Sequence, residues 1–469
     1  MDPRGIRDRI DAQRRWFQGG LVRGSAARRQ RLRLLKRQLI RHEDRLLEAL
    51  RADLGKGGFG ALFSEIAPLY GEINHAAAHV GRWARPRRVR SSPAVFPSSA
   101  RVIPEPFGVA LIIGPWNYPV QLLLSPLVGA LAAGNCAVLK PSELAPHTSA
   151  AVAAMIREGF DPREVAVVEG GREEGKALIE ARPEVIFFTG GSRVGREVMA
   201  AAARELVPVI LELGGKNPCV VDRDTDPKSA ARRIVWGKFY NAGQTCIAPD
   251  FVVAHRGVKQ ALLEAMARAL GRFYGPDPAD SPAYERIINR GHLDRLEGLV
   301  RAARDGGRIL CGGQARPGEL YLAPTIVDGI GWEHPLMAEE IFGPILPVLE
   351  YEELEELIDR LRQRPRPLML LVFTRDRAVE GRLIEAVPSG GVSVNDCLLH
   401  TLVKTLPFGG VGESGMGRYH GKAGFEAFSY PRGVLRRSQG FDLTLRFPPF
   451  PTFKAQGQRL MRHLVRLVR

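Results

Sequence analysis

Residues 185–211 read VIFFTGGSRVGREVMAAAARELVPVIL and contain one complete unit of a regular fold. A short apolar run, Val185–Phe188, leads into a glycine-rich turn. An alanine-rich helical segment, Arg193–Leu206, follows, and a second apolar run begins at Val209. Strand, turn, helix and strand in this order are the repeating unit of a parallel sheet. The stretch therefore predicts an α/β protein.

The same alternation continues on both sides of this unit. Short apolar runs predict three further strands, at Val109–Ile113, Ala137–Leu139 and Val165–Val168. Helical segments lie between them, at Pro119–Ala133, His147–Gly159 and Glu174–Ala181. A second alternating series runs from Asn217 to about Val392, residues 1–85 read as helices, and Ser91–Arg101 reads as an extended connector. We expect a doubly wound parallel sheet, which binds ligands at the carboxyl ends of its strands.

Length and composition narrow the class of protein. The chain has 469 residues, of which 45% are apolar and 25% are charged, as in soluble globular proteins of about three domains. These values exclude a disordered chain, a collagen and a disulfide-stapled miniprotein. We expect reduced thiols, a cytoplasmic location and no bound metal, because no CxxC pair or zinc spacing occurs among the cysteines at 136, 219, 246, 311 and 397.

Charge is distributed unevenly, with basic ends and a mildly acidic middle. The total of +16 divides into +13 over residues 1–101, −5 over 102–431 and +8 over 432–469. This pattern argues against a nucleic-acid-binding protein, although either end suits an anionic surface. Arg459–Arg469 (RLMRHLVRLVR) has the spacing of a basic amphipathic helix. It is either a solvated or partner-packed terminal helix, or a helix in weak contact with a membrane surface, which would make the protein peripheral to the membrane.

No segment reads as a signal peptide or a membrane span. Met1–Ile10 carries charges throughout and has no apolar core. The uncharged stretch Pro106–Leu139 is long enough to cross a bilayer, but GPWNYP at 114–119 interrupts it. A strand, a loop and a buried helix describe this stretch better, so we expect a soluble protein.

Two signals suit a nucleotide, and each has an ordinary alternative. The turn Thr189–Gly195 joins a strand to a helix, and its backbone N–H groups offer a phosphate site, although a tight turn would look the same. Lys140 and Glu143 follow a buried strand, where a carboxylate suits ribose hydroxyls. A solvated loop with Ser142 as a helix cap is the alternative.

Four further positions carry groups that suit catalysis. Cys246 differs from the other cysteines because small and polar residues (NAGQT) precede it, which leaves room for a substrate. Glu212 ends an apolar strand and is either paired with Lys216 or a general base. Asn117 is a turn residue or an oxyanion donor. Glu339 and Glu340 precede Phe342 and a tight turn at Gly343-Pro344. The simplest interpretation of these two carboxylates is that they are solvated acids at a helix end.

Taken together and in this order, these motifs resemble the aldehyde dehydrogenase superfamily over nearly the whole chain. The resemblance rests on six strings: GPWN at 114–117, KPSE at 140–143, FTG at 188–190, ELGGK at 212–216, GQTC at 243–246 and EIFGP at 340–344. Two longer strings, WGKF at 236–239 and PFGGVGESGMGRYHGK at 407–422, resemble the class 3 branch. That branch acts on medium- and long-chain aliphatic or aromatic aldehydes and forms dimers.

The resemblance implies a role for each motif. It makes Cys246 the nucleophile, Glu212 the general base and Asn117 an oxyanion donor together with the backbone N–H of Cys246. The cofactor would contact the following residues: Trp116, Lys140, Glu143, Gly190, Gly191, Ser192, Gly195, Glu340 and Phe342. It also implies a homodimer and NAD as cofactor, with NADP as a second choice.

The resemblance also implies the domain organisation. A Rossmann-like NAD(P)-binding domain would comprise 1–85 and 104–211, and a second α/β domain, 212–392, would carry the nucleophile. Residues 86–103 and 393–431 would form a small oligomerisation or bridging element, with 432–469 as a basic tail. One departure is Gly191, because the family often has Ser directly after Phe-Thr-Gly and this chain has Ser192 one position later. This displacement affects cofactor affinity and the choice between NAD and NADP, and leaves the chemical step unchanged.

Overall fold

The computed structural model describes residues 2–22, 24–92, 95–440, 447–448, 459 and 462–463. Contacts divide the chain into two units: residues 1–84 with 104–430, and residues 85–103 with 431–469. The first unit therefore includes 393–430, which we assigned to the bridging element. The division reflects a pairing that local sequence does not reveal, since β17 (Gly415–Met416) lies antiparallel to β7 (Val209–Leu213) of the first sheet.

The first sheet of the larger unit has the strand order β17-β7-β6-β3-β4-β5. Its predicted strands are confirmed, each within a few residues of its expected bounds: β3 (Val109–Ile113), β4 (Cys136–Lys140), β5 (Val165–Val167), β6 (Val185–Gly190) and β7. These strands run parallel. Because both faces are covered, these strands are apolar up to their carboxyl ends, where Lys140 and Glu212 lie, as in doubly wound sheets.

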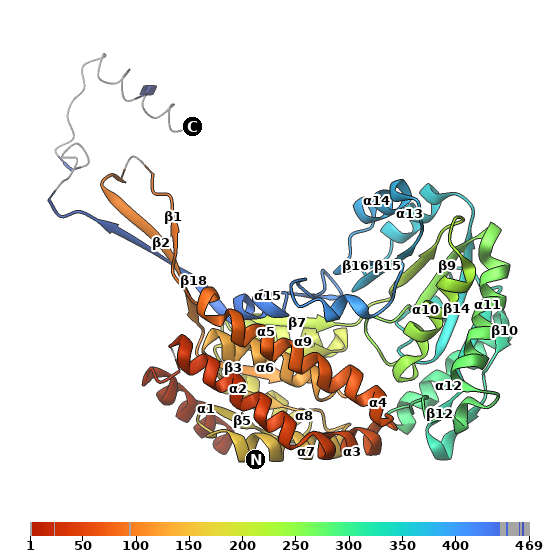
Figure 1. The fold of residues 1–469 in the computed structure, drawn as a ribbon, viewed down its shortest axis with the longest axis horizontal. Helices are drawn as coiled ribbons and strands as arrows, with labels where there is room; N and C mark the ends of the chain where they lie inside the picture. Colours follow the sequence, from red (N-terminus) through yellow and green to blue (C-terminus); the bar gives the residue numbers. More distant parts are fainter. Residues whose placement is uncertain are drawn as a thin grey trace. The chain divides into compact units, whose positions relative to one another are not determined.

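Helices cover the two faces of this sheet according to the alternation of side chains along each strand (Figure 1). Val109, Leu111 and Phe188 point to one face, where they pack with residues of α1 (Pro3–Gln18), α8 (Arg172–Glu180) and α9 (Ser192–Ala203). Ala110, Ile112 and Phe187 point to the other. That face packs with residues of α2 (Ser25–Arg41), α5 (Ala67–Trp83), α6 (Gln121–Ala133) and α7 (Pro146–Gly159).

Shorter elements connect these helices. α3 (Glu43–Leu54) and α4 (Gly58–Ala61) precede a π-helical turn, η1 (Leu62–Ile66), which continues directly into α5. Near the end of the unit, α15 (Gly421–Ala427) packs on α6 and α5. A Cβ on Gly129 of α6 would lie 2.9 Å from the carbonyl oxygen of Gly424, so glycine allows the close approach of α6 and α15.

A second sheet, also in the larger unit, has the order β10-β13-β14-β9-β8-β15-β16. Its strands are β8 (Pro218–Val221), β9 (Phe251–His255), β10 (Arg308–Cys311), β13 (Thr325–Asp328), β14 (Ile345–Tyr351), β15 (Met369–Phe373) and β16 (Gly391–Val394). All pairs are parallel except β10 with β13. The alternating helices are α10 (Pro227–Phe239), α11 (Arg256–Tyr274), α12 (Arg290–Gly306), α13 (Leu354–Arg362) and α14 (Arg377–Ala386). The predicted second α/β series is confirmed.

Short elements complete this region: the hairpin β11 (Ala315–Arg316) with β12 (Tyr321–Leu322), and the 3-10 turns η3 (Tyr240–Gly243), η4 (Pro278–Asp280), η5 (Pro317–Glu319), η6 (Pro335–Met337) and η7 (Leu399–Leu402).

The smaller unit contains most of a sheet with strand order β1-β2-β18, formed by β1 (Arg87–Val89), β2 (Ser98–Pro106) and β18 (Ser429–Arg437). β1 and β2 are antiparallel. The expected connector at Ser91–Arg101 is therefore a strand from Ser98 onward, because it pairs with the nearby β1 and with β18, which is distant in sequence. Most of Arg459–Arg469, for which we predicted a helix, lies outside the described residues.

Candidate active site

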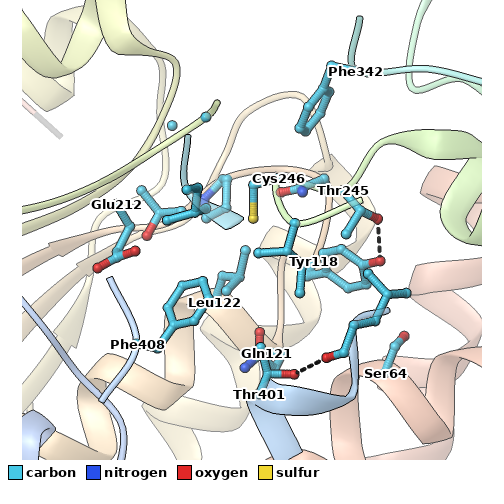
Figure 2. Close-up of a pocket in the computed structure, with 18 of the residues that line it drawn as sticks. Ser64, Tyr118, Gln121, Leu122, Glu212, Thr245, Cys246, Phe342, Thr401 and Phe408 are labelled. Atoms are coloured by element: carbon cyan, nitrogen blue, oxygen red, sulfur yellow. Dashed lines mark hydrogen bonds between the residues drawn. The ribbon is translucent and has the colours of Figure 1, made fainter. Parts of the chain in front are cut away.

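A pocket of about 370 Å³ opens where the two sheets of the larger unit approach each other (Figure 2). Most of the predicted site residues line it: Trp116, Asn117, Gly190, Gly191, Glu212, Cys246, Glu340 and Phe342. The remaining four predicted residues, Lys140, Glu143, Ser192 and Gly195, are not among its lining residues. The loops after β3, β6 and β7 converge there with the loop after η3, as expected for carboxyl ends of parallel strands.

Cys246 follows a strained turn. Asn241 and Ala242 have φ of 55° and 51°, the left-handed region that costs such residues about 1–3 kcal/mol each. At Gly243 a Cβ would lie 2.2 Å from the carbonyl oxygen of Gly343, so no larger residue fits. Nδ2 of Asn217 donates to the carbonyl oxygen of Cys246 at 2.7 Å. The loop is thus fixed before the cysteine by the close contact at Gly243 and at the cysteine itself by the hydrogen bond from Asn217.

The surroundings of Cys246 favour the neutral form of its thiol. Burial raises its pKa well above the ordinary value, and the carboxyl groups of Glu340 and Glu212 raise it further. A thiolate is the nucleophilic form of cysteine. The attack therefore requires a base or a change in the surroundings of the sulfur.

Glu212 is 3% exposed, and neither carboxyl oxygen has a hydrogen-bond partner among the described residues. Burial raises its pKa well above the ordinary value, and the charge of Arg418 opposes that shift. The alternative of an ion pair with Lys216 is wrong, because Lys216 Nζ lies 2.6 Å from Asp250 Oδ2 instead. A Cβ on Gly409 would lie 2.9 Å from Glu212 Oε1, so a glycine makes room for the carboxyl group.

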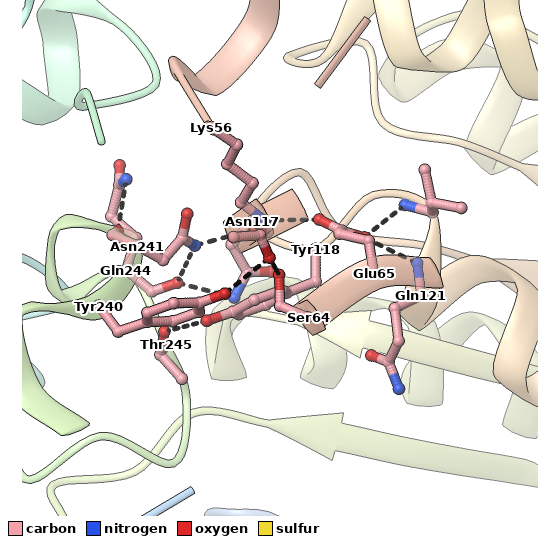
Figure 3. A network of polar contacts seen from close by, with 12 residues as sticks. Lys56, Ser64, Glu65, Asn117, Tyr118, Gln121, Tyr240, Asn241, Gln244 and Thr245 are labelled. Atoms are coloured by element: carbon pink, nitrogen blue, oxygen red, sulfur yellow. Dashed lines mark hydrogen bonds and ion pairs between the residues drawn. The ribbon is translucent and has the colours of Figure 1, made fainter. Parts of the chain in front are cut away.

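Asn117 lies in the loop between β3 and α6 and is buried. Its Nδ2 donates to the carbonyl oxygen of Gln244 at 3.0 Å, which joins its side chain to the cysteine loop. Its own carbonyl oxygen accepts from Lys56 Nζ at 2.9 Å and from Asn241 Nδ2 at 3.0 Å (Figure 3). An amide has two N–H groups, so the second is available to a ligand in the pocket.

The residues that we predicted to contact a nucleotide belong to the first sheet and to the loops and helix that follow its strands. Lys140 ends β4, and its Nζ lies 2.6 Å from Glu143 Oε2. Gly191 is the N-cap of α9, where a Cβ would meet nothing within 4 Å, and Ser192 Oγ donates to the carbonyl oxygen of Glu413 at 3.3 Å. A Cβ on Gly195 would lie 2.6 Å from Leu213, so this glycine allows α9 to pack closely on β7.

Glu340 and Phe342 close the other side of the pocket. A Cβ on Gly214 would lie 1.9 Å from Glu340 Oε2, so the carboxyl group rests against bare backbone. Burial, with the charge of Asp250, raises the pKa of Glu340 to about 8. The ring of Phe342 meets that of Trp116 edge to face at 5.4 Å. Phe342 has a φ of 46°, a strained value for a bulky residue.

Sequence reasoning missed the polar residues that support this site. Lys216 donates to Asp250 and to the carbonyl oxygens of Leu336 and Glu339 at 2.7 and 2.8 Å, which ties the segment before Glu340 to the end of β7. Two other supporting residues, Lys56 and Glu65, lie far from the motifs in sequence. Lys216 ends the string ELGGK and Asn217 follows it directly, but the partners of both residues are distant in sequence.

A family model, that of the aldehyde dehydrogenase family, matches residues 9–434. The chain belongs to the aldehyde dehydrogenase family. Aldehyde dehydrogenase family 3 member B2 of Mus musculus is 43% identical over 449 residues, 95% of this chain and 93% of the relative. The Homo sapiens family 3 member B1 is 44% identical over 451 residues, 96% and 95% of the two chains. The resemblance to the class 3 branch is confirmed.

A solved structure agrees with this assignment. The substrate-bound state of Staphylococcus aureus AldH has a TM-score of 0.93 and 39% identity, and the match covers 98% of this chain and 99% of that one. The predicted architecture of a Rossmann-like domain with a second, catalytic α/β domain is thereby confirmed. The protein is an oxidoreductase that acts on aldehydes.

Aldehyde dehydrogenases use NAD or NADP, and the residues present fit such a cofactor. The N-terminus of α9 is open at Gly191. Thr189 Oγ1, beside it, is buried without a hydrogen-bond partner in the described part of the chain. Lys140 ends β4, which is separated from β6 by β3, and Glu143 follows it three residues later. These groups suit phosphate and ribose oxygens.

The described residues contain no cluster of three or more His, Cys, Asp or Glu side chains that would hold a metal ion. Within the same residues, no helix is both long and apolar enough to span a membrane.

Proposed function

We propose that this enzyme oxidises apolar aldehydes to carboxylic acids, with Cys246 as nucleophile, Glu212 as general base and Asn117 as oxyanion donor. The observation that carries this proposal is the convergence of a half-buried thiol and an unpartnered buried carboxyl group in one pocket. A buried acid without a partner is costly unless it serves a reaction.

The reaction follows from what these groups can do. The sulfur of Cys246 attacks the aldehyde carbon and forms a thiohemiacetal, as its proton leaves to a base. Nδ2 of Asn117 and the backbone N–H of Cys246 donate to the developing oxyanion, and one such donor contributes about 3–4 kcal/mol. A bound NAD(P) would supply the hydride acceptor, and loss of hydride from the thiohemiacetal carbon would leave a thioester on Cys246.

Glu212 completes the cycle. Its raised pKa makes its carboxylate a stronger base than an ordinary glutamate. In that form it takes a proton from water as the water attacks the thioester. The acid is released and Cys246 regains its proton. The presence of Glu212 favours hydrolysis over transfer of the acyl group to coenzyme A, and product analysis with and without coenzyme A separates the two.

The cofactor is placed by two groups of residues. Lys140 and Glu143 bind the adenosine ribose, and Gly190, Gly191, Ser192 and Gly195 form the pyrophosphate turn. On the opposite side, Glu340 binds the nicotinamide ribose, with Trp116 and Phe342 near the ring. Because Glu143 repels a 2′-phosphate and Lys140 attracts one, we expect NAD to be preferred and NADP to be accepted.

The outer part of the pocket supports an apolar substrate. Its lining includes side chains from elements far apart in sequence: Phe63, Leu122, Trp236, Tyr240, Leu398, Leu402 and Phe408. Apolar and aromatic linings bind substrates through burial of apolar surface. Medium- and long-chain aliphatic or aromatic aldehydes fit this surface.

The assembly and location that we propose rest on the family and the composition. A homodimer follows from the class 3 branch, through the bridging element at 86–103 and 393–431. Reduced cysteines support a cytoplasmic enzyme. Arg459–Arg469 would provide a weak membrane-surface contact, and a deletion of these residues that leaves co-sedimentation with anionic vesicles unchanged would refute that contact.

The experiment that tests the function is NADH formation with hexanal, decanal, hexadecanal, benzaldehyde and coniferyl aldehyde. A Cys246→Ala variant, checked for folding and NAD binding, runs beside the wild type. We expect activity that the substitution abolishes. Activity that survives in the variant would refute Cys246 as the nucleophile. A folded, NAD-binding wild type that oxidises none of these aldehydes would refute the proposed substrate class.

A further inference from the structure

A buried ion pair lies beneath the loop that carries Asn117 (Figure 3). Lys56 Nζ lies 2.5 Å from Glu65 Oε1, and the two side chains are 1% and 0% exposed. Removing two charges from water costs several kcal/mol per ion, and apolar residues of similar volume serve stability at least as well. The pair therefore calls for an explanation other than stability.

Both members of the pair contact the backbone around Asn117. Lys56 donates to the carbonyl oxygen of Asn117 at 2.9 Å, and its ammonium lies 4.0 Å from the centre of the Tyr118 ring. Glu65 Oε2 accepts from the N–H groups of Val120 and Gln121 at 3.1 and 2.9 Å. These amides open α6, where no intrahelical acceptor exists. A single ion pair thus fixes both ends of the segment from Asn117 to Gln121.

Glu65 lies in the π-helical turn η1, where an extra residue per turn redirects side chains. Two exposed apolar residues, Leu62 and Phe63, precede it on this turn, and Phe63 lines the pocket. The turn therefore places one side chain in the pocket wall and another beneath the Asn117 loop.

The same segment is joined to the cysteine loop. Asn241 Nδ2 donates to the carbonyl oxygens of both Asn117 and Gln244, at 3.0 and 3.1 Å. The carbonyl oxygen of Gln244 also accepts from Asn117 Nδ2. In addition, the hydroxyl groups of Tyr118 and Thr245 are 2.6 Å apart, directly before Cys246. Lys56 Nζ and Asn241 Nδ2 thus both donate to the carbonyl oxygen of Asn117 and join the two loops.

We infer that Lys56 and Glu65 are positioning residues that set the amide of Asn117 at the distance from the backbone N–H of Cys246 at which both donate to one oxyanion. This inference rests on the roles proposed above for Asn117 and Cys246. Oxyanion donors act within about 2.7–3.1 Å of the oxygen, and a displacement of about 1 Å costs about 10²-fold in rate. The hydrogen bonds of Lys56 and Glu65 with the backbone of the Asn117 loop provide this precision.

The test compares two reactions of the same sulfur. Acyl transfer from p-nitrophenyl acetate to Cys246 passes through a tetrahedral oxyanion, with p-nitrophenolate as leaving group. Alkylation by iodoacetamide forms an S–C bond and expels iodide without any oxyanion. The first rate is read from p-nitrophenolate release, and the second from mass spectrometry of the peptide that contains Cys246.

The variants are Glu65→Gln, Lys56→Met and the double variant Lys56→Met/Glu65→Gln, which avoids a lone buried charge if a single variant fails to fold. Asn117→Ala is the reference for loss of the donor. Lys259→Met is the matched control, because Lys259 and Asp328 form a largely buried pair at 2.8 Å, with side chains 14% and 10% exposed, away from the pocket lining.

We expect the positioning variants to lose about 10²-fold in acylation and in kcat/KM for aldehydes, with alkylation and NAD affinity unchanged. Asn117→Ala should show the same pattern. Lys259→Met should lose neither acylation rate nor kcat/KM. If Asn117→Ala shows this pattern and every folded positioning variant does not, the inference is overturned and the proposed function stands. If Asn117→Ala leaves acylation intact, the oxyanion role and the inference fail together. Equal losses in acylation and alkylation would indicate general disorder of the site and would also overturn the inference.

Discussion

Lys216 pairs with Asp250 at 2.6 Å and leaves Glu212, only four residues before it, without a cation in hydrogen-bond contact among the described residues. Lys216 also donates to the carbonyl oxygen of Glu339, directly before Glu340. Glu212 lies at the end of β7 and lines the pocket together with Cys246. One motif therefore supplies both a structural cation and a free carboxyl group. The chemistry proposed for Glu212 depends on this separation.

Replacing Glu212 by Gln should block hydrolysis of the thioester. Because an amide cannot take a proton from water, we expect kcat to fall by about 10²–10⁴-fold while the first turnover still occurs. Rapid-mixing measurements should then show a burst of NADH followed by a slow steady state. Glu426→Gln, at an exposed pair with Lys422, is the control. Loss of the burst itself would contradict the assignment of Glu212 to the hydrolysis step.

Replacing Lys216 by Met should weaken both the fold and cofactor binding. The substitution leaves the buried carboxylate of Asp250 with the more distant Lys238, at 3.7 Å, and the backbone N–H of Ile341, and we expect a loss of about 3–5 kcal/mol in the free energy of unfolding. The Glu339 carbonyl also loses its donor, so the dissociation constant for NAD should rise. Chemical denaturation and NAD titration measure the two effects. Lys422→Met, at an exposed ion pair, should change neither, and an unchanged denaturation midpoint for Lys216→Met would refute the prediction.

Replacing Glu143 by Gln should shift the cofactor preference toward NADP. The carboxylate pairs with Lys140 at 2.6 Å, and its removal frees the lysine for a 2′-phosphate and ends the repulsion of that phosphate. We expect the NADP KM to fall and the NAD KM to rise, each by about tenfold, which is about 1.4 kcal/mol. Glu169→Gln, which breaks an exposed pair with Arg157, is the control. Parallel changes in both KM values would contradict the proposed role of this pair.

Sequence alone predicted the first sheet and eight of the residues that line the pocket, because short local patterns indicate both. Val109–Ile113 and Val185–Phe188 are apolar on both faces of a strand, and Cys246 and Glu212 stand in short strings that resemble those of a known family. The site followed from these strings, since the carboxyl ends of parallel strands meet at one edge. Local pattern and topology were therefore sufficient for these residues.

The supporting residues were not predictable, because their partners are distant in sequence. Glu65 contacts the backbone of Val120, 55 residues away, and Lys216 pairs with a residue that follows the cysteine loop. Nothing in the neighbourhood of either residue indicates its partner. A charged residue in an apolar region shows only that some partner must exist. For the same reason, an ion pair between Glu212 and Lys216 was plausible from the sequence, although in the structure Lys216 pairs with Asp250.

We expect Glu285 to make the stability of the enzyme depend on pH. Its carboxyl group is 4% exposed, and burial raises its pKa to about 7, although Lys56 and the backbone N–H groups of Asn241 and Ala242 oppose this shift. Tyr240, Tyr274 and Tyr284, whose own pKa values its charge raises, also face it. A carboxyl group raised in the folded state contributes its full stability below its unfolded pKa, near 4.5, and loses it as pH rises toward 7.

Between about pH 4.5 and 7 the unfolded chain releases this proton while the folded enzyme retains it. The free energy of unfolding should therefore fall across this window by about 3 kcal/mol from Glu285 alone and then level off. Glu285→Gln has no proton to release, so its free energy of unfolding should decline less over the same range. Denaturant titrations of both proteins at pH 5, 6, 7 and 8 measure the difference. Parallel curves for the two proteins would show that Glu285 does not titrate in this window.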